Sequence, residues 1–257
     1  MTDGAFPTTY HIFDGAWQPV NGQVIEEALV SIHVNGQELA TIAATPIRQD
    51  WLAVGFLANE GFIASMSEVR AVHVCPSGLC VDVWLAASRE IEPPQRRILT
   101  SGCGGGVTFD DLTKTQPPLD SDLRLPAEQL WGLQDQLQGA AQLYRRTRGV
   151  HTSALFRDVR LLSSAEDVGR HNTLDKIRGD CLLRSVETRE GILLSTGRIS
   201  SEMLSKAARM GCPVVASRTS ATSLSVSLAR AWNITLVGYL RRSQMSVYAN
   251  GWRLGLA

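Results

Sequence analysis

The stretch ILLSTGRISSEMLSKAARMGCPVVASRTSATSLSVSLARAWNITLVGYL, residues 192–240, decides the fold. Three apolar runs, at 192–195, 213–217 and 234–240, alternate with two segments whose length and composition are typical of helices. Ser200 or Ser201 is expected to cap the first of these helices, and Thr222 the second. Strands that alternate with helices of this length are typical of a largely parallel sheet covered by helices on both faces. The sequence therefore predicts an α/β fold for this half of the chain.

Arginine follows each of these predicted strands. Arg198 comes after the first strand, Arg218 after the second, and Arg241 with Arg242 after the third. Ligands of open α/β sheets bind beyond the carboxyl ends of the strands, and arginine suits paired hydrogen bonds to phosphate. We therefore expect these arginines to hold a phosphate-bearing ligand such as a nucleotide. The alternative is that some of them form structural ion pairs with Glu166, Asp167 and Asp175.

The preceding segment EDVGRHNTLDK, residues 166–176, concentrates polar groups at a predicted helix start. Asn172 is expected to cap that helix, which places Arg170 and His171 where an anion would meet the helix dipole. A second histidine, His151, stands at a predicted helix-to-strand junction. Both histidines are candidates for acid–base roles, and a purely structural role is the alternative for each.

Between these segments and the N-terminal half, one further helix and one hairpin are predicted. Pro126 opens the helix, whose apolar face repeats at spacings of three and four and whose last turn is rich in arginine before Gly149. The hairpin joins residues 151–156 to 159–164.

The N-terminal half is predicted to contain mainly strands. Asn35-Gly36 is a strong hairpin signal, and Thr45 and Pro46 are expected to cap and begin a helix that ends at Gly61. The predicted strands of this half cover 28–34, 37–43, 69–74 and 81–85. The acidic, proline-bearing segment 109–126 is the expected linker. We therefore expect an α+β domain at 1–118 and an α/β domain at 119–257.

The bulk composition is that of an ordinary globular protein, with 44% hydrophobic and 19% charged residues. The formal net charge of +0 argues against general nucleic-acid binding. Neither a membrane-spanning apolar stretch nor a signal peptide is found, so we expect no membrane association and a cytoplasmic location. The charge is unevenly divided: residues 1–130 carry 7 basic and 16 acidic residues, and residues 131–257 carry 18 and 9.

The segment TSGCGGG, residues 100–106, sets Cys103 among four glycines. Such surroundings leave a thiol accessible, whereas a structural cysteine packs as a small hydrophobe. The chain has five cysteines, and in a reducing compartment we expect thiols in place of a disulfide framework. The spacing of Cys75 and Cys80 is at the long end of what a zinc site allows. A turn between two strands explains this spacing equally well.

Several motifs together closely resemble the FdhD family of formate dehydrogenase accessory proteins. In the C-terminal half they are HTSALF, EDVGRHNTLDK, STGRISSEMLSKAARMGCPVVASRTSATSLSVSLA and ITLVGYLRR with SVY. In the N-terminal half they are DWLAVGFLANEGFI and TSGCGGG, so the resemblance covers nearly the whole chain.

The resemblance implies a sulfurtransferase that accepts persulfide sulfur from a cysteine desulfurase. It would pass this sulfur to the molybdenum bis(guanine dinucleotide) cofactor, a transient ligand, before the cofactor enters formate dehydrogenase. A cytidine-deaminase-like larger domain and a homodimer are also implied, with no tightly bound metal. Cys103 matches the persulfide-bearing cysteine of the family. His151 and His171 are expected to tune or orient the reacting groups. The cofactor would be held by Arg170, Arg198 and Arg218 together with the stretch Tyr239, Leu240, Arg241, Arg242, Ser243 and Gln244.

The sequence departs from the family pattern at one position. Many members carry a second cysteine in the loop, where this chain has Gly106. A single cysteine can still hold a persulfide, but a non-catalytic cofactor chaperone is the alternative. The zinc signature of cytidine deaminases is absent from the sequence, so zinc-dependent deamination is excluded.

Overall fold

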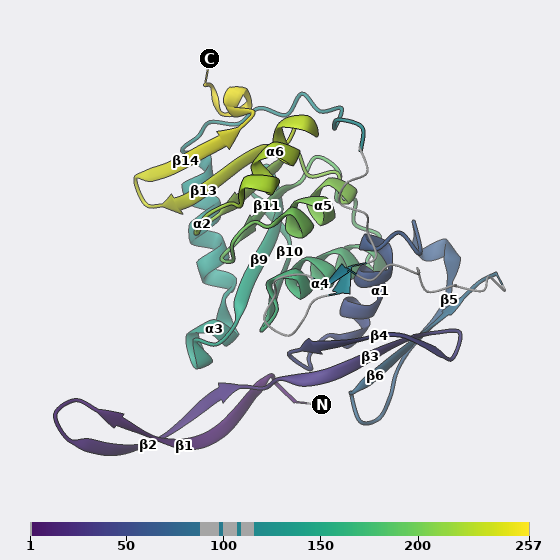
Figure 1. Ribbon diagram of the computed structural model, residues 1–257, viewed down its shortest axis with the longest axis vertical. Coiled ribbons are helices and arrows are strands. Elements are labelled where there is room, and N and C mark those ends of the chain that lie inside the picture. The colour runs from purple at the N-terminus through teal and green to yellow at the C-terminus, as the bar shows by residue number, and fades with distance from the viewer. Residues whose placement is uncertain (1, 88–97, 100–106, 109–115, 257) are drawn as a thin grey trace.

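The computed structural model describes residues 2–87, 98–99, 107–108 and 116–256 (Figure 1). A four-stranded sheet with one helix occupies the N-terminal part. A six-stranded sheet with helices on both faces occupies the C-terminal part. A separate two-stranded ribbon, β1 (Ala5–Phe13) with β2 (Trp17–Ile25), extends from the molecule near the N-terminus. The predicted mixture of helices and strands is thus confirmed as a mixed α/β architecture with several sheets.

The large sheet has the strand order β10-β9-β11-β12-β13-β14. Its strands are β9 (His151–Arg157), β10 (Arg160–Asp167), β11 (Ile192–Ser195), β12 (Val214–Ser217), β13 (Thr235–Arg241) and β14 (Gln244–Ala249). β11, β12 and β13 are parallel, as expected, but β9, β10 and β14 pair antiparallel. The expectation of a largely parallel sheet was therefore wrong, because a hairpin extends the parallel centre on each side.

Helices cover both faces of this sheet, as predicted. α4 (Arg170–Leu183), α5 (Ser201–Arg209) and α6 (Ser223–Ala231) pack on one face, and α2 (Gln129–Ala140) packs on the other. The strands alternate accordingly: one set of buried side chains faces α4–α6, namely Leu155, Leu193, Val215 and Leu236. The next residues in line face α2, namely Phe156, Leu194, Ala216 and Val237. None of the helices described here combines the length and apolar character needed to cross a bilayer.

The ends of the helices agree only partly with the sequence predictions. Ser200 caps α5 and Thr222 caps α6, each accepting a hydrogen bond from a backbone N–H in the first turn. The helix predicted from Pro126 to Gly149 is instead broken at Ala141 into α2 and α3 (Gln142–Thr147). The break has a physical cause. The Glu166 carboxylate accepts hydrogen bonds, at 2.7 and 2.8 Å, from the backbone N–H groups of Leu143 and Tyr144 in the first turn of α3.

The N-terminal sheet has the order β4-β3-β6-β5. It comprises β3 (Ala28–Val34), β4 (Gln37–Ala44), β5 (Val69–Val74) and β6 (Cys80–Leu85), which confirms the hairpin and both further strands. The helix start was wrong: α1 (Gln49–Asn59) follows Arg48 and does not begin at Pro46. Thr45 is fully buried, and its hydroxyl accepts the Val168 N–H, so it connects two parts of the chain and does not cap α1.

Four short segments remain. The strands β7 (Ile98–Leu99) and β8 (Val107–Thr108) pair antiparallel, and η1 (Met66–Glu68) and η2 (Gly251–Leu254) are 3-10 helices. Of the predicted linker, residues 116–126 are described and form no helix or strand. Buried Arg253 holds this segment, donating to the Ser121 carbonyl at 3.1 Å, while the Leu125 N–H donates to the Arg253 carbonyl. Residues 109–115 lie outside the described part of the chain.

Helices α1 and α4 join the two sheets by a close backbone contact. A Cβ atom added at Gly55 would lie 1.7 Å from the Asp175 carbonyl oxygen, and one added at Gly179 would lie 1.9 Å from that of Trp51. Both neighbours are helix backbone, which cannot move aside without shifting the helix. The two glycines therefore allow α1 and α4 to pack at a distance that no other residue permits.

This contact predicts that Gly55→Ala lowers the free energy of unfolding by roughly 3 kcal/mol or more, at the upper end of overpacking effects. Gly132→Ala in α2 is the matched control, because an added Cβ there meets nothing within 4 Å and alanine favours helix. Urea unfolding of both variants measures the difference. Equal stability of the two variants would contradict the assigned contact.

Candidate functional site

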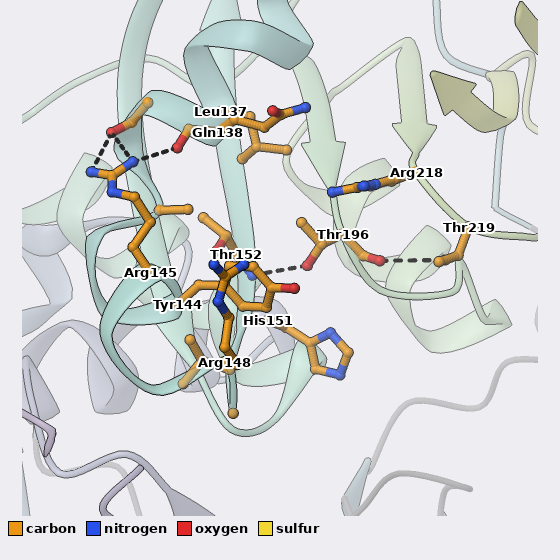
Figure 2. Close-up of a pocket in the computed structure, with 14 residues that line it drawn as sticks. Leu137, Gln138, Tyr144, Arg145, Arg148, His151, Thr152, Thr196, Arg218 and Thr219 are labelled. Carbon is orange, nitrogen blue, oxygen red and sulfur yellow. Dashed lines mark hydrogen bonds between the residues drawn. The ribbon is translucent and has the colours of Figure 1, made fainter. Parts of the chain in front are cut away.

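A pocket of about 920 Å³ opens where α3, the start of β9 and the carboxyl ends of β11 and β12 meet (Figure 2). β9 runs antiparallel to β11, so its first residue lies at the edge where β11 and β12 end. The side chains that matter for its chemistry are Tyr144, Arg145, Arg148, His151, Thr196 and Arg218. The pocket thus occupies the sheet edge at which the sequence predicted a ligand.

Buried hydroxyl groups hold this edge in one conformation. The Ser195 hydroxyl accepts hydrogen bonds from the Ser153 hydroxyl at 3.0 Å and from the Gly197 N–H at 3.2 Å. The Ser217 hydroxyl donates to the Gly197 carbonyl at 2.6 Å, and the Thr196 hydroxyl accepts the Thr152 N–H at 3.0 Å. Because these bonds link three strands, the turn after β11 has little freedom to move.

Three arginines give the pocket its positive charge. The Arg145 guanidinium donates to the carbonyls of Gln138 and Gly139, which holds it against the end of α2. Arg148 lies 5.3 Å from the centre of the Tyr144 ring, and Arg218 is exposed beyond the end of β12. Figure 2 shows Arg148 and Arg218 around the mouth near His151. Such an arrangement suits an anionic ligand.

His151 and Arg170 meet at the Gly197 turn. A Cβ added at Gly197 would lie 2.9 Å from Arg170 Cβ and 3.3 Å from His151 Nδ1. Burial and the Arg170 charge lower the pKa of His151, while Asp167 opposes this change. The imidazole is therefore neutral near pH 7 and can donate and accept hydrogen bonds at the pocket wall.

His171 lies behind this wall in a buried cluster of charges. Its Nε2 atom is 3.0 Å from the Ser200 hydroxyl and 3.4 Å from a Glu202 carboxylate oxygen. Burial, Lys206, Arg170 and His151 lower the pKa of His171 to about 2. The Glu202 carboxylate does not reverse this shift, because Lys206 Nζ lies 3.6 Å from its other oxygen. His171 is therefore neutral.

Lys206 is the cation at the centre of this cluster. Its ammonium group lies 2.7 Å from an Asp175 oxygen, and Asn59 donates to the other Asp175 oxygen at 2.8 Å. Burial opposes its charge, but Asp175, Glu202 and Glu60 outweigh burial and raise the pKa of Lys206. Lys206 therefore remains positively charged near His171, and this charge disfavours protonation of the His171 imidazole.

A second buried ion pair fixes the turn that leads into α4. The Asp167 carboxylate accepts hydrogen bonds from Lys176 Nζ at 2.6 Å, the Gly169 N–H at 2.7 Å, the Asn172 amide at 2.8 Å and the Thr45 N–H at 3.1 Å. The expected cap was wrong: Gly169 occupies the N-cap position, and Asn172 lies inside the first turn. The carboxylates of Asp167 and Asp175 thus pair with lysines, and that of Glu166 with backbone N–H groups.

The structure brings some of the predicted site residues together and separates others. His151 and Arg218 line the pocket, with Arg170 and His171 directly behind it. Within the described residues, Arg198 and the stretch 239–244 do not line it. Leu240 is buried in the core, and Arg242, almost fully exposed, lies 3.8 Å from Asp135 of α2. Cys103 lies outside the described residues.

Several functional candidates were missed by the sequence reasoning. Arg145 and Arg148 belong to the arginine-rich last turn of the predicted helix and Tyr144 to its apolar face, and the sequence assigned none of them to the site. The sequence feature that could have identified them is the cluster of arginines directly before His151. A segment that leads into this strand lies beside the sheet edge. Glu202 and Lys206 gave no separate signal, since their roles depend on the packing of α5 against α4.

The cysteines differ from the expectation of free thiols. Cys75 and Cys80 form a disulfide across the turn between β5 and β6, so that expectation was wrong for this pair. Burial raises the pKa of Cys181 to about 11 and that of Cys212 to about 12, which suppresses thiolate formation. Within the described residues, no group of His, Cys, Asp or Glu side chains is arranged to hold a metal ion.

Fold and site together define an α/β protein with a cation-lined pocket at the carboxyl edge of its sheet. Residues 25–255 match the model of the FdhD/NarQ family, and the chain belongs to this family. It is 35% identical over 245 residues to the sulfur carrier protein FdhD of Bacillus pumilus (strain SAFR-032), with 94% of each chain covered. Identity to the sulfur carrier protein FdhD of Staphylococcus aureus (strain MRSA252) is 33% over 246 residues, covering 94% of this chain and 92% of the relative.

A solved structure is also similar. The crystal structure of "a putative formate dehydrogenase accessory protein" from Desulfotalea psychrophila superposes with a TM-score of 0.80. The two sequences are 27% identical, and the superposition covers 97% of this chain and 99% of the other. The family resemblance inferred from the sequence motifs is thereby confirmed.

The buried, neutral His171 predicts a specific dependence of stability on pH. The unfolded chain binds a proton at this histidine below about pH 6.5, whereas the folded chain does not until about pH 2. The free energy of unfolding should therefore fall by about 2 kcal/mol from this residue alone between about pH 7.5 and pH 5.

Urea unfolding of His171→Gln at the two pH values tests this dependence. The variant should lose that part of the pH dependence, while His11→Gln on the exposed ribbon should retain it. If the wild type and His171→Gln show the same loss of stability on acidification, the assignment of a neutral His171 is wrong.

Proposed function

We propose that this protein is a sulfur carrier that serves formate dehydrogenase by carrying sulfur on Cys103. The observation that carries the proposal is the membership of the family whose relatives are named sulfur carrier proteins. The cysteines of the described residues support it by elimination. Two of them are joined in a disulfide, and two are buried with raised pKa values. Cys103 is the remaining thiol of the chain.

The proposed loading step is a persulfide exchange. The Cys103 thiolate attacks the outer sulfur of a persulfide on a cysteine desulfurase, and the desulfurase cysteine leaves as a thiolate. The outer sulfur is then held on Cys103 as a new persulfide. No electrons enter or leave the pair of proteins in this step, because the sulfane sulfur keeps its oxidation state.

The proposed acceptor is the molybdenum bis(guanine dinucleotide) cofactor, which the protein would bind as a substrate. The pocket supports this part of the proposal, because Arg145, Arg148 and Arg218 are suited to phosphate groups. The neutral His151 could orient a ligand at the same wall without adding charge. The mixed six-stranded sheet with helices on both faces is compatible with the proposed cytidine-deaminase-like fold.

A second candidate is a non-catalytic chaperone that binds and delivers the same cofactor. Gly106, which stands where the family resemblance implies a second cysteine, favours this alternative. The two candidates share the pocket and differ in whether Cys103 holds sulfur. Mass spectrometry can therefore separate them.

Incubation with a cysteine desulfurase and cysteine should add one sulfur, about 32 Da, at the thiol selected by accessibility and thiolate character. Peptide mapping should place this mass on the peptide that contains residues 100–106. Cys103→Ala should lose the added mass and fail to activate formate dehydrogenase. Cys75→Ala/Cys80→Ala, which removes both sulfur atoms of the disulfide and leaves no new thiol, is the control and should retain both. Full activation by Cys103→Ala would favour the chaperone.

The pocket should also bind guanosine diphosphate through its arginines. Loss of one charge-assisted contact to phosphate removes about 1.5–3 kcal/mol, so Arg218→Ala should weaken binding by about 10-fold or more. Arg160→Ala is the control, since Arg160 is exposed at the opposite end of the β9–β10 hairpin from His151. Calorimetry measures both. Unchanged affinity in Arg218→Ala would remove that residue from the site.

A further inference from the structure

Glu166 and Asp167 are neighbours at the end of β10 and point to opposite faces of the large sheet. Asp167 bonds to α4 on one face, whereas the Glu166 side chain reaches α3 on the other. The Glu166 carboxylate is half-buried and accepts hydrogen bonds from the Leu143 N–H at 2.7 Å and the Tyr144 N–H at 2.8 Å. Within the described residues, the lining of the cation-lined pocket does not include Glu166. Any influence of Glu166 on a ligand must therefore pass through its neighbours.

The local sequence of α3 does not supply acceptors for the N–H groups of its first turn. Ala141 occupies the N-cap position and has no side-chain acceptor, and the helix is six residues long. First-turn N–H groups are commonly satisfied by the N-cap side chain, and helices this short are marginal on their own. The Glu166 carboxylate provides, from β10, the two acceptors that the local sequence lacks. The position of α3 therefore depends on Glu166.

The hydrogen bonds of Glu166 continue to Arg148 through the backbone of Tyr144. The Tyr144 N–H donates to Glu166, and the Tyr144 carbonyl accepts the Arg148 N–H at 2.8 Å. The Arg148 guanidinium lies 5.3 Å from the centre of the Tyr144 ring, so this arginine contacts both the backbone and the side chain of Tyr144. Arg148 also has a left-handed backbone, with φ of 57°, which residues other than glycine adopt infrequently. The direction of Arg148 at the pocket mouth therefore follows the position of Tyr144.

The other two arginines of the pocket are held in different ways. The Arg145 guanidinium donates to backbone carbonyls at the end of α2, at 2.8 and 3.1 Å. Arg218 follows β12 and belongs to the sheet, not to α3. Arg148 is therefore the pocket arginine whose placement depends most directly on Glu166.

Glu166 also contacts the part of the pocket wall that β9 provides. The Thr152 hydroxyl donates to the Glu166 carboxylate at 3.3 Å. The Thr152 N–H in turn donates to the Thr196 hydroxyl at 3.0 Å, as Figure 2 shows. Thr152 and Thr196 line the pocket together with Arg148. One carboxylate thus fixes the spacing between α3, which leads to Arg148, and the edge of the sheet.

Charge and position have opposite consequences at Glu166. A carboxylate near an anion site disfavours the anion through its charge, so charge alone would make Glu166 unfavourable for binding. Its hydrogen bonds have the opposite effect, because they hold Arg148 where an anion can reach it. Removal of the charge and loss of the position therefore change the affinity in opposite directions, and the sign of the change separates the two effects.

We propose that Glu166 is a positioning residue of the cation-lined pocket, and that its hydrogen bonds to α3 set the affinity for phosphate-bearing ligands. Glu166 acts through the Tyr144 backbone on Arg148. The inference rests on the proposed function for the anionic character of the ligand. Its new content is that a negatively charged residue outside the pocket lining strengthens the binding of an anion.

Calorimetry of the full chain with guanosine diphosphate and with inorganic pyrophosphate tests this role. Glu166→Gln removes the charge and leaves one acceptor for two N–H groups. Both ligands should then bind about 5-fold or more weakly, the effect of losing one ordinary hydrogen bond. Glu166→Asp keeps the charge but is too short to hold both N–H groups, so it should also weaken binding.

Glu68→Gln is the matched control for a general loss of stability. The Glu68 carboxylate also accepts two backbone N–H groups at the start of a short helix, those of Ala64 at 2.7 Å and Ser65 at 3.2 Å. None of these three residues lines the cation-lined pocket. Glu68→Gln therefore removes a similar contact in the N-terminal half and should leave both affinities unchanged.

A double-mutant cycle identifies the arginine through which Glu166 acts. In an Arg148→Ala background, Glu166→Gln should change the affinity by less than about 2-fold, because the side chain that it positions is already absent. In an Arg218→Ala background, the full effect of Glu166→Gln should remain.

The possible failures can be told apart. Unchanged or tighter binding by Glu166→Gln overturns the inference and leaves the proposed ligand intact, as do equal effects in the two arginine backgrounds. A wild type that binds neither guanosine diphosphate nor pyrophosphate overturns the proposed ligand and this inference together.

Discussion

The buried Asp167 carboxylate is the interaction on which the rest of the structure depends. It is fully buried and accepts four hydrogen bonds, from Lys176, Gly169, Asn172 and Thr45. Thr45 belongs to the strand-to-helix junction of the N-terminal sheet, whereas the other three belong to the N-cap and the first two turns of α4. One carboxylate therefore accepts hydrogen bonds from both halves of the chain and links them. Removing one partner of such a buried pair is costly, because the other charge is left uncompensated.

The position of the candidate site follows from this clamp. The turn after Asp167 places Arg170 and His171 at the start of α4, directly behind the pocket wall that carries His151. Both histidines are kept neutral by burial and by neighbouring cations. The positive charge of the pocket therefore comes from arginines, whose charge does not change near neutral pH. A site of this kind binds anions equally well across the physiological range.

The sequence predicted those features that depend on local pattern. The strands around Asn35-Gly36 and the helices capped by Ser200 and Thr222 are examples, because each signal lies within the element itself. Thr45 and Asn172 were misassigned for the opposite reason. Each has a side chain suited to cap a helix. In the structure each instead donates a hydrogen bond to Asp167, whose position depends on the fold. The split of α2 from α3 likewise depends on Glu166, which is distant in sequence.

The candidate site shows the same division between local and distant causes. His151 and Arg218 could be predicted because they stand at the ends of recognisable strands. The contribution of Arg145 and Arg148 could not, because it required the path of α3 past the sheet edge. The ribbon was missed although Asp14-Gly15 is a turn signal, since Pro7 and Pro19 interrupt the strand pattern on either side.

The central claim is that the Asp167 clamp and the α1–α4 contact make the two halves one cooperative structure. Native-state hydrogen exchange at increasing urea concentrations tests this most directly, because it gives an opening free energy for each helix. The account predicts that the most protected amides of α1 and α4 open together, with the free energy of global unfolding. Exchange of α1 through a separate opening of lower free energy, with α4 still protected, would contradict it.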